Sequence, residues 1–412
     1  MFAYSEDKLC CDGVPLTEIA EEAGTPCYVY SARDILSAWQ SYDRAFGSVP
    51  HEVCYAVKAN SNLAVLALLA KAGSGFDIVS AGELHRVLAA GGDPARVVFS
   101  GVGKTAEEMQ FAMERGIHSF NCESVAELEV LDFVAARCGR KIHFALRVNP
   151  DVNAATHPYI STGLRQHKFG IDLSEASDVY HRAKRFRNLV ATGVSCHIGS
   201  QILELDPLLE AAGKVLALAT ALRASGHPID HLDLGGGLGI AYQPGDHPPA
   251  ITQLVERLGG VIAQSRFKIM VEPGRSIVGA AGVLLTRVLY LKHNAGKNFV
   301  IVDAAMNDLI RPALYQAHHE ISPVVRRDAG RIVADVVGPV CETGDFLARG
   351  RDLPSVGPGH LLAIEAAGAY GFSQASNYNS RPRAAEVLVE EGKWRIVRAR
   401  ESYADLIRGE RV

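Results

Sequence analysis

The sequence lacks the features that would place the chain in a membrane, outside the cell or on nucleic acid. Its 412 residues contain no apolar run close to the roughly 18 residues that cross a bilayer. The first twenty residues carry acidic side chains in place of the apolar centre of a signal peptide. The net charge of −4 offers no basic surface for nucleic acid or for an anionic membrane. We therefore expect neither a membrane nor a nucleic-acid partner.

The chain also lacks the cysteine spacing of a disulfide framework or a metal site. Its eight cysteines are scattered and none forms a CxxC pair, and we interpret the adjacent Cys10 and Cys11 as packing residues. Scattered, unpaired thiols in a long chain are typical of a reducing compartment. We expect a cytoplasmic protein. Since hydrophobic residues make up 48% of the chain and charged ones 21%, a large core and two domains are possible.

Apolar runs alternate with amphipathic segments over the first two thirds of the chain. The runs are Val53–Val57, Gly75–Val79, Val97–Ser100, Ile117–Asn121, Ile142–Val148, Leu189–Cys196, Ile229–Leu234 and Phe267–Val271. Helical patterns lie between nearly all of them, at 60–73, 81–91, 105–115, 124–138, 174–187, 204–225 and 250–265. This rhythm predicts an α/β fold, a (β/α)8 TIM barrel, and a doubly wound open sheet is the alternative.

The residues at the ends of these runs favour the barrel. Polar or special residues lie at or just past the end of every run: Lys58, Ser80 with Asp77 nearby, Ser100, Asn121, Arg147, His197, Gly235–Gly237 and Glu272. In a TIM barrel the chemistry lies at the carboxyl ends of the strands. A purely structural pattern would scatter such residues over both ends.

The pattern changes near Gly279. Short runs rich in valine and isoleucine follow, divided by glycine and proline: Val283–Leu291, Phe299–Asp303, Arg331–Val337, Leu361–Glu365, Glu386–Val389 and Trp394–Arg398. They predict a mainly antiparallel β domain, a sandwich or barrel-like unit. Strand-like pieces near both chain ends suggest that residues 1–29 and 279–412 form it, and residues 30–278 the barrel. We expect a short helix near Tyr403–Ile407.

Three motifs at the predicted barrel mouth suggest chemistry. Lys58 directly follows an apolar strand, and a poorly hydrated lysine is a candidate Schiff-base former. The alternative is that its side chain extends into water, which is more common for a lone lysine at a strand end. Leu234–Gly239 does not complete GxGxxG and fits a nest for one phosphate better than a dinucleotide site, and a tight turn is the alternative. Glu272 could hold the protonated ring nitrogen of a cofactor, or form a surface ion pair.

Histidines give weaker signals. His197 could stack on a flat ring or transfer protons. No second histidine stands at a metal-ligand spacing from it, so we expect no zinc site. The neighbours His318 and His319 look like polar residues that face solvent.

Several long motifs together resemble one family. They are YAVKAN (55–60), FDIVSAGEL (76–84), HPYISTGLRQHKFGI (157–171), SCHIGSQ (195–201), LDLGGGLG (232–239), EPGR (272–275), MNDLIRPALY (306–315), CETGD (341–345) and GAYGFSQASNYNSRPR (368–383). The chain resembles the diaminopimelate decarboxylases, in the alanine-racemase-like group (fold type III) of pyridoxal-phosphate enzymes. Thr343 and Gln374 stand where the family often has serine and methionine.

The resemblance implies a role for individual residues. Lys58 would bind the aldehyde of pyridoxal 5'-phosphate, His197 would stack on its ring and Glu272 would pair with its nitrogen. The other residues that would contact the cofactor are Asp77, Ser200, Gly236, Gly237, Gly274, Arg275 and Tyr370. Arg275, Arg311, Tyr315 and Tyr370 would bind the substrate, with Glu342 at its distal ammonium. Cys341 would be the proton donor, reaching the site from the partner subunit of a homodimer.

The implied reaction is decarboxylation of meso-2,6-diaminopimelate to L-lysine, the last step of lysine biosynthesis. Two arginines suit a small amino-acid substrate with two carboxylates, because guanidinium groups bind carboxylates bidentately. The alternatives are a decarboxylase of ornithine, lysine or carboxynorspermidine, an amino-acid racemase, or a non-catalytic carrier of pyridoxal phosphate.

Overall fold

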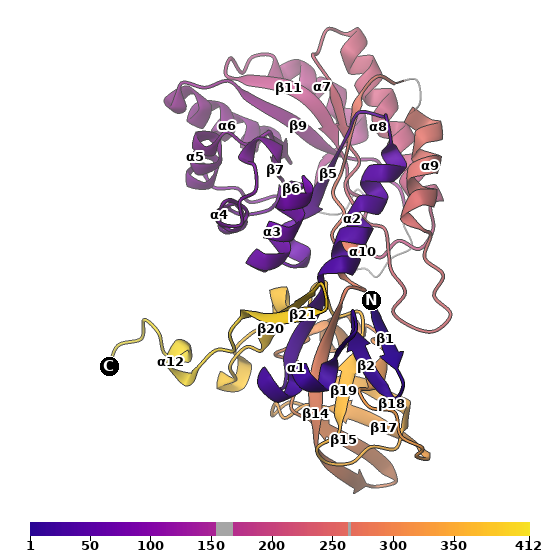
Figure 1. Cartoon of the computed structure of the whole chain (residues 1–412). Helices are drawn as coiled ribbons and strands as arrows, with labels where there is room; N and C mark the ends of the chain where they lie inside the picture. Colours follow the sequence, from indigo (N-terminus) through magenta and orange to yellow (C-terminus); the bar gives the residue numbers. More distant parts are fainter. Residues whose placement is uncertain (154–167, 263–264) are drawn as a thin grey trace. The chain divides into compact units, whose positions relative to one another are not determined.

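The computed structural model describes residues 1–153, 168–262 and 265–412 (Figure 1). The chain divides into two compact units. One, the barrel unit, comprises residues 37–240 and 247–276, and the other, the β unit, comprises residues 1–36, 241–246 and 277–412. Each unit is described by itself.

The barrel unit is a closed parallel β-barrel, as predicted. Its strands are β5 (His51–Ala56), β6 (Gly75–Ile78), β7 (Val97–Phe99), β8 (Ser119–Cys122), β9 (Ile142–Asn149), β11 (Leu189–Ser195), β12 (His231–Asp233) and β13 (Lys268–Val271). Each strand pairs in parallel with the next, β13 pairs with β5, and the pairing of β8 with β9 is part of the same closed ring. The short β10 (Ile171–Asp172) adds to β9. The closed ring excludes the open-sheet alternative.

Helices separate the strands and lie around their outside (Figure 1). They are α3 (Leu63–Ala72), α4 (Ala81–Ala89), α5 (Ala106–Arg115), α6 (Val125–Cys138), α7 (Leu173–Ala183), α8 (Asp206–Ala224) and α9 (Ile251–Ile262). Local sequence sets their ends: Ser80, Thr105 and Ser124 cap amino termini with their side chains, and Gly116 and Gly139 end α5 and α6 in left-handed conformations. Two further helices, α2 (Ala32–Phe46) and α10 (Arg275–Val278), cross the division between the units.

The barrel interior is filled with side chains. Cys54, Val98 and Met270, from three different strands, form one buried cluster. Phe99 and Phe120 stack with ring centroids 5.8 Å apart. The strands therefore enclose a packed core, which leaves chemistry to the ends of the strands.

The β unit is built from both ends of the chain. Its larger sheet contains β4 (Cys27–Ser31), β14 (Gly282–Asn294), β15 (Lys297–Val302), β16 (Ile321–Pro323), β17 (Arg331–Val337), β18 (Phe346–Pro354), β19 (Leu361–Ile364), β20 (Ala385–Glu390) and β21 (Lys393–Arg398). The amino-terminal β4 lies between β14 and β20. Most pairs are antiparallel, and β15 with β17 and β4 with β20 are parallel.

Smaller elements complete the β unit. They are a sheet of β1 (Phe2–Ser5), β2 (Lys8–Cys11) and β3 (Val14–Pro15), and the helices α1 (Leu16–Glu22), α11 (Arg311–Tyr315) and α12 (Tyr403–Leu406). One buried cluster joins Ile19 and Val29 to Leu285 and Val387. The sequence analysis missed β18, because charged residues interrupt this half-exposed strand. Among the described helices, none is both long enough and apolar enough to cross a membrane.

Candidate active site

Lys58 lies at the carboxyl end of β5 and is held there by an acid from the next strand. It occupies a single 3-10 turn, Val57–Ala59, that follows the strand directly. The hydroxyl of Tyr55 donates to the carbonyl of Asn60 at 3.0 Å and ties this turn back to β5. Lys58 Nζ lies 2.6 Å from Asp77 Oδ2, and the Asp77 side chain is fully buried in β6. The amine is therefore ion-paired at the barrel mouth and does not extend freely into solvent.

Glu83, which the sequence analysis did not select, stands near this pair. Its Oε2 accepts from the backbone N–H of Val79 at 2.7 Å. Burial raises the pKa of Glu83 from 4.5 to about 7, while its bond to Val79 and the charge of Lys58 lower it. The signal was hidden because a glutamate three residues after Ser80 resembles an ordinary helix cap. The fold gives this carboxyl a pKa suited to proton transfer near neutral pH.

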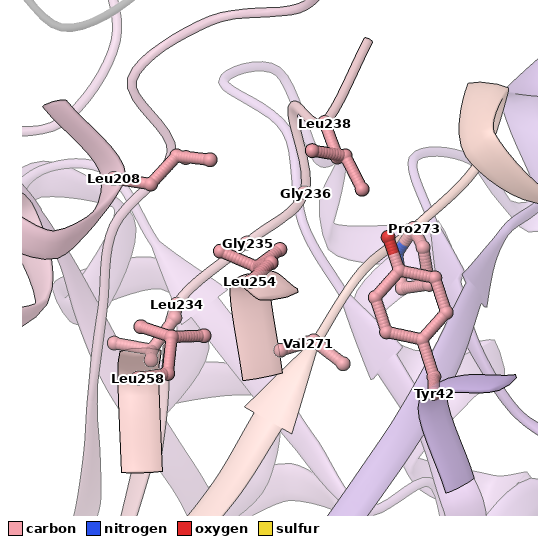
Figure 2. Close-up of a pocket in the computed structure, with 10 residues that line it drawn as sticks. All are labelled: Tyr42, Leu208, Leu234, Gly235, Gly236, Leu238, Leu254, Leu258, Val271 and Pro273. Atoms are coloured by element: carbon pink, nitrogen blue, oxygen red, sulfur yellow. The ribbon is translucent and has the colours of Figure 1, made fainter. Parts of the chain in front are cut away.

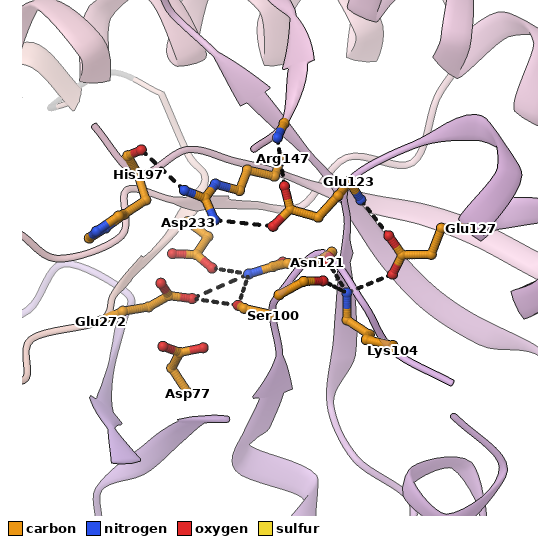
Figure 3. A network of polar contacts seen from close by, with 12 residues as sticks. Asp77, Ser100, Lys104, Asn121, Glu123, Glu127, Arg147, His197, Asp233 and Glu272 are labelled. Carbon is orange, nitrogen blue, oxygen red and sulfur yellow. Dashed lines mark hydrogen bonds and ion pairs between the residues drawn. The ribbon is translucent and has the colours of Figure 1, made fainter. Parts of the chain in front are cut away.

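Figure 3 shows a second acidic group, around Glu272, at the ends of β12 and β13. The side-chain amide of Asn121 donates to Asp233 Oδ2 at 2.7 Å and to Glu272 Oε1 at 3.2 Å. The hydroxyl of Ser100 lies 3.4 Å from Glu272 Oε1. Burial raises the pKa of Glu272 well above its usual range, and the nearby Asp233 and Asp77 raise it further. Burial and the two neighbouring acids thus favour the protonated form of Glu272.

The remaining charges in Figure 3 are paired structurally. Arg147 lies 3.1 Å from Glu123 Oε1, and Glu123 Oε2 accepts from the N–H of Gly170 at 2.6 Å. Lys104 is fully buried and donates to Glu127 Oε1 at 2.6 Å and to the carbonyls of residues 101 and 121 at 2.6 and 2.8 Å. Because an ammonium group has three donors, Lys104 is saturated and cannot act as the nucleophile in this state.

His197 follows β11 and is bonded to the glycine loop. The N–H of Gly236 donates to His197 Nδ1 at 3.2 Å, so this nitrogen carries no proton. Burial, Arg147 and Lys58 lower the pKa of His197 well below its usual value. The ring is therefore neutral, with its proton on Nε2, and presents a flat face without a charge.

Close packing requires glycine at residues 235–237. A Cβ at Gly235 would lie 2.5 Å from the carbonyl oxygen of Cys196, and one at Gly236 would lie 2.3 Å from that of Glu272. Gly235 and Gly237 also have φ angles of +64° and +119°. The loop thus brings backbone close to the ends of β11 and β13, as a phosphate cradle requires.

Three other predicted cofactor residues, Ser200, Gly274 and Arg275, lie in the same unit as this loop. The guanidinium group of Arg275 donates from its terminal nitrogen to Ser200 Oγ at 2.9 Å. A Cβ at Gly274 would lie 2.9 Å from that of Ala59, which places this backbone directly against the Lys58 turn.

Figure 2 shows a pocket beside the glycine loop, between the ends of β12 and β13 and the helices α2, α8 and α9. Half of its ten lining residues are leucine, and the others include Gly235, Gly236, Val271 and Pro273. The hydroxyl of Tyr42, its one titratable group, is 2.8 Å from Ser276 Oγ. The leucine side chains of this pocket pack beside the glycine loop, and its one titratable side chain, Tyr42, is bonded to Ser276.

In the β unit, Arg311 begins α11 and is held by two rings. Its terminal nitrogen donates to His319 Nε2 at 2.7 Å, and its guanidinium carbon lies 4.4 Å from the ring centroid of Tyr242. His319 Nδ1 is 2.8 Å from the carbonyl of Glu365, which fixes a neutral tautomer. The prediction that His319 faces solvent was wrong, because this side chain is fully buried.

The structure places the remaining predicted residues in the same β unit. Tyr315 ends α11, and Gln374 Nε2 lies 3.3 Å from its hydroxyl. Cys341 and Glu342 are exposed in this chain. Tyr370 has a φ of +55°, an unusual backbone conformation for a side chain of this size. Of the motif at 157–171, residues 157–167 lie outside the described residues.

Thus Lys58, Asp77, His197, Ser200, Gly236, Gly237, Glu272, Gly274 and Arg275 lie in the barrel unit, and Arg311, Tyr315, Cys341, Glu342 and Tyr370 in the β unit. The barrel residues gather at the carboxyl ends of the strands. Their individual roles stay predictions.

Comparisons with known proteins identify the family. The family model described as "Pyridoxal-dependent decarboxylase, pyridoxal binding domain" matches residues 32–279. The chain is 56% identical over 409 residues to the diaminopimelate decarboxylase of Pseudomonas aeruginosa, covering 99% of this chain and 98% of the relative. It is 52% identical over 412 residues to that of Vibrio cholerae, covering 98% and 97%.

Solved structures agree. The diaminopimelate decarboxylase of Helicobacter pylori complexed with L-lysine has a TM-score of 0.92 and 43% identity, covering 95% of this chain and 98% of the other. That of M. jannaschii has a TM-score of 0.95 and 37% identity, covering 100% and 98%. Since the similarity extends over nearly the whole chain in both sequence and structure, this protein belongs to the diaminopimelate decarboxylase family of pyridoxal-dependent decarboxylases.

Proposed function

We propose that this protein decarboxylates meso-2,6-diaminopimelate to L-lysine and carbon dioxide, with pyridoxal 5'-phosphate as its cofactor. The observation that carries the proposal is the Lys58–Asp77 pair, 2.6 Å apart at the end of β5. The pair supports the proposal because it holds an amine at the end of a barrel strand, in a chain that is 56% identical to a diaminopimelate decarboxylase.

The residues at the barrel mouth fit this cofactor. A loop of three glycines, in which a Cβ would collide with backbone, has no side chains and so lets a phosphate approach its backbone. We propose that Gly236, Gly237, Ser200, Tyr370 and the Gly274–Arg275 backbone hold the phosphate. The neutral face of His197 suits stacking on a ring. Asp77 Oδ1 is buried and has no hydrogen-bond partner among the described residues, which leaves it available to a bound group.

Glu272 would control the charge of the ring. When bound, the protonated pyridine ring accepts the electron pair that the departing carboxylate leaves on the substrate α-carbon. Burial and the nearby Asp233 raise the pKa of Glu272 and favour its protonated form. Glu272 would hold a ring nitrogen in its protonated form, and its carboxylate would stabilise the positive charge.

Lys58 must lose a proton before it can bind the cofactor aldehyde. Asp77 favours the charged ammonium form, so a proton acceptor has to be near. We propose Glu83 for this task, since its pKa of about 7 lets it gain or lose a proton near neutral pH.

The substrate would be recognised at both of its ends. Arg275, Arg311, Tyr315 and Tyr370 would bind its carboxylates, Glu342 would bind its distal ammonium, and Cys341 would protonate the α-carbon. The His319 bond and the Tyr242 ring support this role for Arg311, because they hold the guanidinium in one orientation before substrate arrives. Ornithine and lysine lack the distal carboxylate, and binding them would leave an arginine unpaired.

We further propose a homodimer in which Cys341 and Glu342 enter the active site of the partner subunit. Both side chains are exposed in the single chain, as residues that serve another subunit would be. We also propose a cytoplasmic location, which is in keeping with eight cysteines that are all free thiols.

Carbon dioxide release from a panel of diamino acids tests the reaction. We expect meso-diaminopimelate to react at least about 10³ times better than ornithine or lysine, as kcat/KM, because a site with unpaired polar groups rejects the shorter analogues. A preference for ornithine or lysine would refute the proposed substrate. Interconversion of stereoisomers without carbon dioxide release would instead indicate a racemase.

Mixing two inactive variants tests the shared site. Lys58→Ala removes the cofactor lysine, and Cys341→Ala removes the proton donor. If each site uses Lys58 of one chain and Cys341 of the other, mixed dimers contain one intact site. Random exchange makes half of the dimers mixed, so about a quarter of wild-type activity per chain should return. No recovery after confirmed subunit exchange would contradict the shared site.

A further inference from the structure

Two loops of the β unit meet at one buried carboxylate, Asp345. One is the Arg311 loop, residues 304–311, and the other is the Cys341 loop, residues 338–345. Asp345 Oδ1 accepts from the N–H of Met306 at 2.7 Å, and Oδ2 accepts from the N–H of Val340 at 2.7 Å. The side chain is 4% exposed. A single carboxylate thus receives one backbone donor from each loop.

Hydrogen bonds stiffen the path from Met306 to Arg311. The carbonyl of Ala305 accepts from the N–H groups of Asp308 and Leu309 at 2.9 and 3.0 Å. Asp308 Oδ2 accepts from the N–H of Ala305 at 3.0 Å and closes the turn. The helix α11 begins at Arg311 directly after this turn. Because few bonds in this short path can rotate freely, a shift at Met306 moves the arginine.

The Cys341 loop is equally constrained at its base. The N–H of Asp345 donates to the carbonyl of Glu342 at 3.0 Å, and that of Glu342 donates to the carbonyl of Val340 at 2.8 Å. The N–H of Cys341 donates to Asn379 Oδ1 at 2.9 Å. A Cβ at Gly338 would lie 2.5 Å from Asp345 Oδ2 and 2.6 Å from the carbonyl oxygen of Ala304, so the two loops touch here.

The contact requires an acid rather than an amide. Both oxygens of Asp345 act as acceptors, and asparagine has only one oxygen to offer. Burial raises the pKa of Asp345, whereas the N–H groups of Met306 and Val340 lower it and favour the charged form. Asparagine has the same shape but would turn an N–H₂ group toward one of the two backbone donors.

We propose that Asp345 is a positioning residue that couples the Arg311 loop to the Cys341 loop and thereby links the two active sites of the dimer. This rests on the proposed function, in which Arg311 serves the site of its own chain and Cys341 that of the partner. A change at Asp345 in one chain then alters substrate binding in one site and proton donation in the other.

Dimers with one intact site can separate the two effects. In such a dimer the Lys58→Ala chain supplies the Cys341 loop, and the Cys341→Ala chain supplies the barrel with its Arg311 loop. Asp345→Asn in the Lys58→Ala chain removes about one hydrogen bond from the base of the Cys341 loop and so displaces the proton donor. It should lower kcat about tenfold with little change in KM. In the Cys341→Ala chain it should raise KM about tenfold with a smaller change in kcat.

Asp335→Asn is the matched control. Asp335 is a buried acid of the same unit, 5% exposed. It accepts from the N–H of Gly350 at 2.7 Å and pairs with Lys297 at 2.6 Å, and both partners lie outside the two loops. Asp335→Asn should keep the kcat and KM of the single-site dimer within about twofold of the values of the parent dimer. The coupling is refuted if the parent dimer is active and Asp345→Asn changes neither kcat nor KM. It is also refuted if Asp345→Asn has an effect in only one of the two chains.

An inactive parent dimer would refute the shared site and with it the link between the two active sites. A second measurement then decides whether Asp345 couples the two loops within one chain. Cys341 is the exposed cysteine among eight, all of which lie in the described residues, so its rate of labelling by a thiol reagent reports the loop. In the uniform holoenzyme, Asp345→Asn should change this rate at least threefold and raise KM. Gly338→Ala, which forces the loops apart at their contact, should do the same if Asp345→Asn does not fold. An unchanged labelling rate would overturn the proposal.

Discussion

Replacing Glu272 with glutamine tests how the barrel controls the charge of the cofactor ring. Glu272 is 7% exposed and lies beside Asp233, which is fully buried. Glutamine keeps the shape and can keep the contacts to Asn121 and Ser100 at 3.2 and 3.4 Å. It removes the ionisable carboxyl, which would otherwise share a proton with the ring nitrogen and carry the balancing negative charge.

The expected magnitude follows from that loss. Removing one preorganised electrostatic contact in a buried site costs about 3–4 kcal/mol, which lowers kcat by about 10²–10³. KM should change little, because the ring nitrogen is remote from the carboxylates of the substrate. Steady-state carbon dioxide release measures both constants. The absorbance of the bound cofactor reports ring protonation, and it should shift toward the unprotonated form in Glu272→Gln.

Glu123→Gln is the matched control. Glu123 is equally buried, at 7% exposed, but it pairs with Arg147 and with the N–H of Gly170. Its replacement should lower stability and leave the cofactor absorbance unchanged. A Glu272→Gln enzyme within about threefold of the wild-type kcat would show that another group controls the ring charge, and would refute the reasoning from Glu272.

Three further predictions concern single side chains. Borohydride should fix the cofactor on Lys58 and not on the saturated Lys104, and peptide mapping that finds the label on Lys104 would contradict the site. Burial raises the pKa of Glu83 from 4.5 to about 7. As the pH rises from 4.5 to 7, the unfolding free energy of the cofactor-free wild type should therefore fall by about 3 kcal/mol relative to that of Glu83→Gln. Urea unfolding at pH 5 and 8 measures this, and equal differences at both pH values would count against the shift. His319→Phe should raise KM roughly 10- to 100-fold by removing the acceptor of the substrate-binding arginine, whereas the control His318→Phe should not, and similar effects from both would argue against this contact.

The order of the barrel elements could be predicted from the sequence alone. Apolar runs that alternate with helical patterns specify parallel strands with crossover helices, because each segment shows its own periodicity locally. Lys58, the three glycines and Glu272 were found because each directly follows a strand, and parallel strands bring these ends together. The long motifs identified the family for the same reason, since each is contiguous in sequence.

Only the tertiary structure decided the contacts between segments that are separated in the sequence. The pKa of Glu83 depends on burial near Lys58, 25 residues earlier, and the local sequence indicates only a helix cap. His319 looked like a surface residue, because nothing near it in sequence shows that it packs on Tyr242 and supports Arg311. The strand β4 enters the sheet between β14 and β20 because the apolar residues of both chain ends share one core. Burial and contacts between segments that are separated in the sequence, by eight residues to several hundred, set these properties, and no local pattern encodes them.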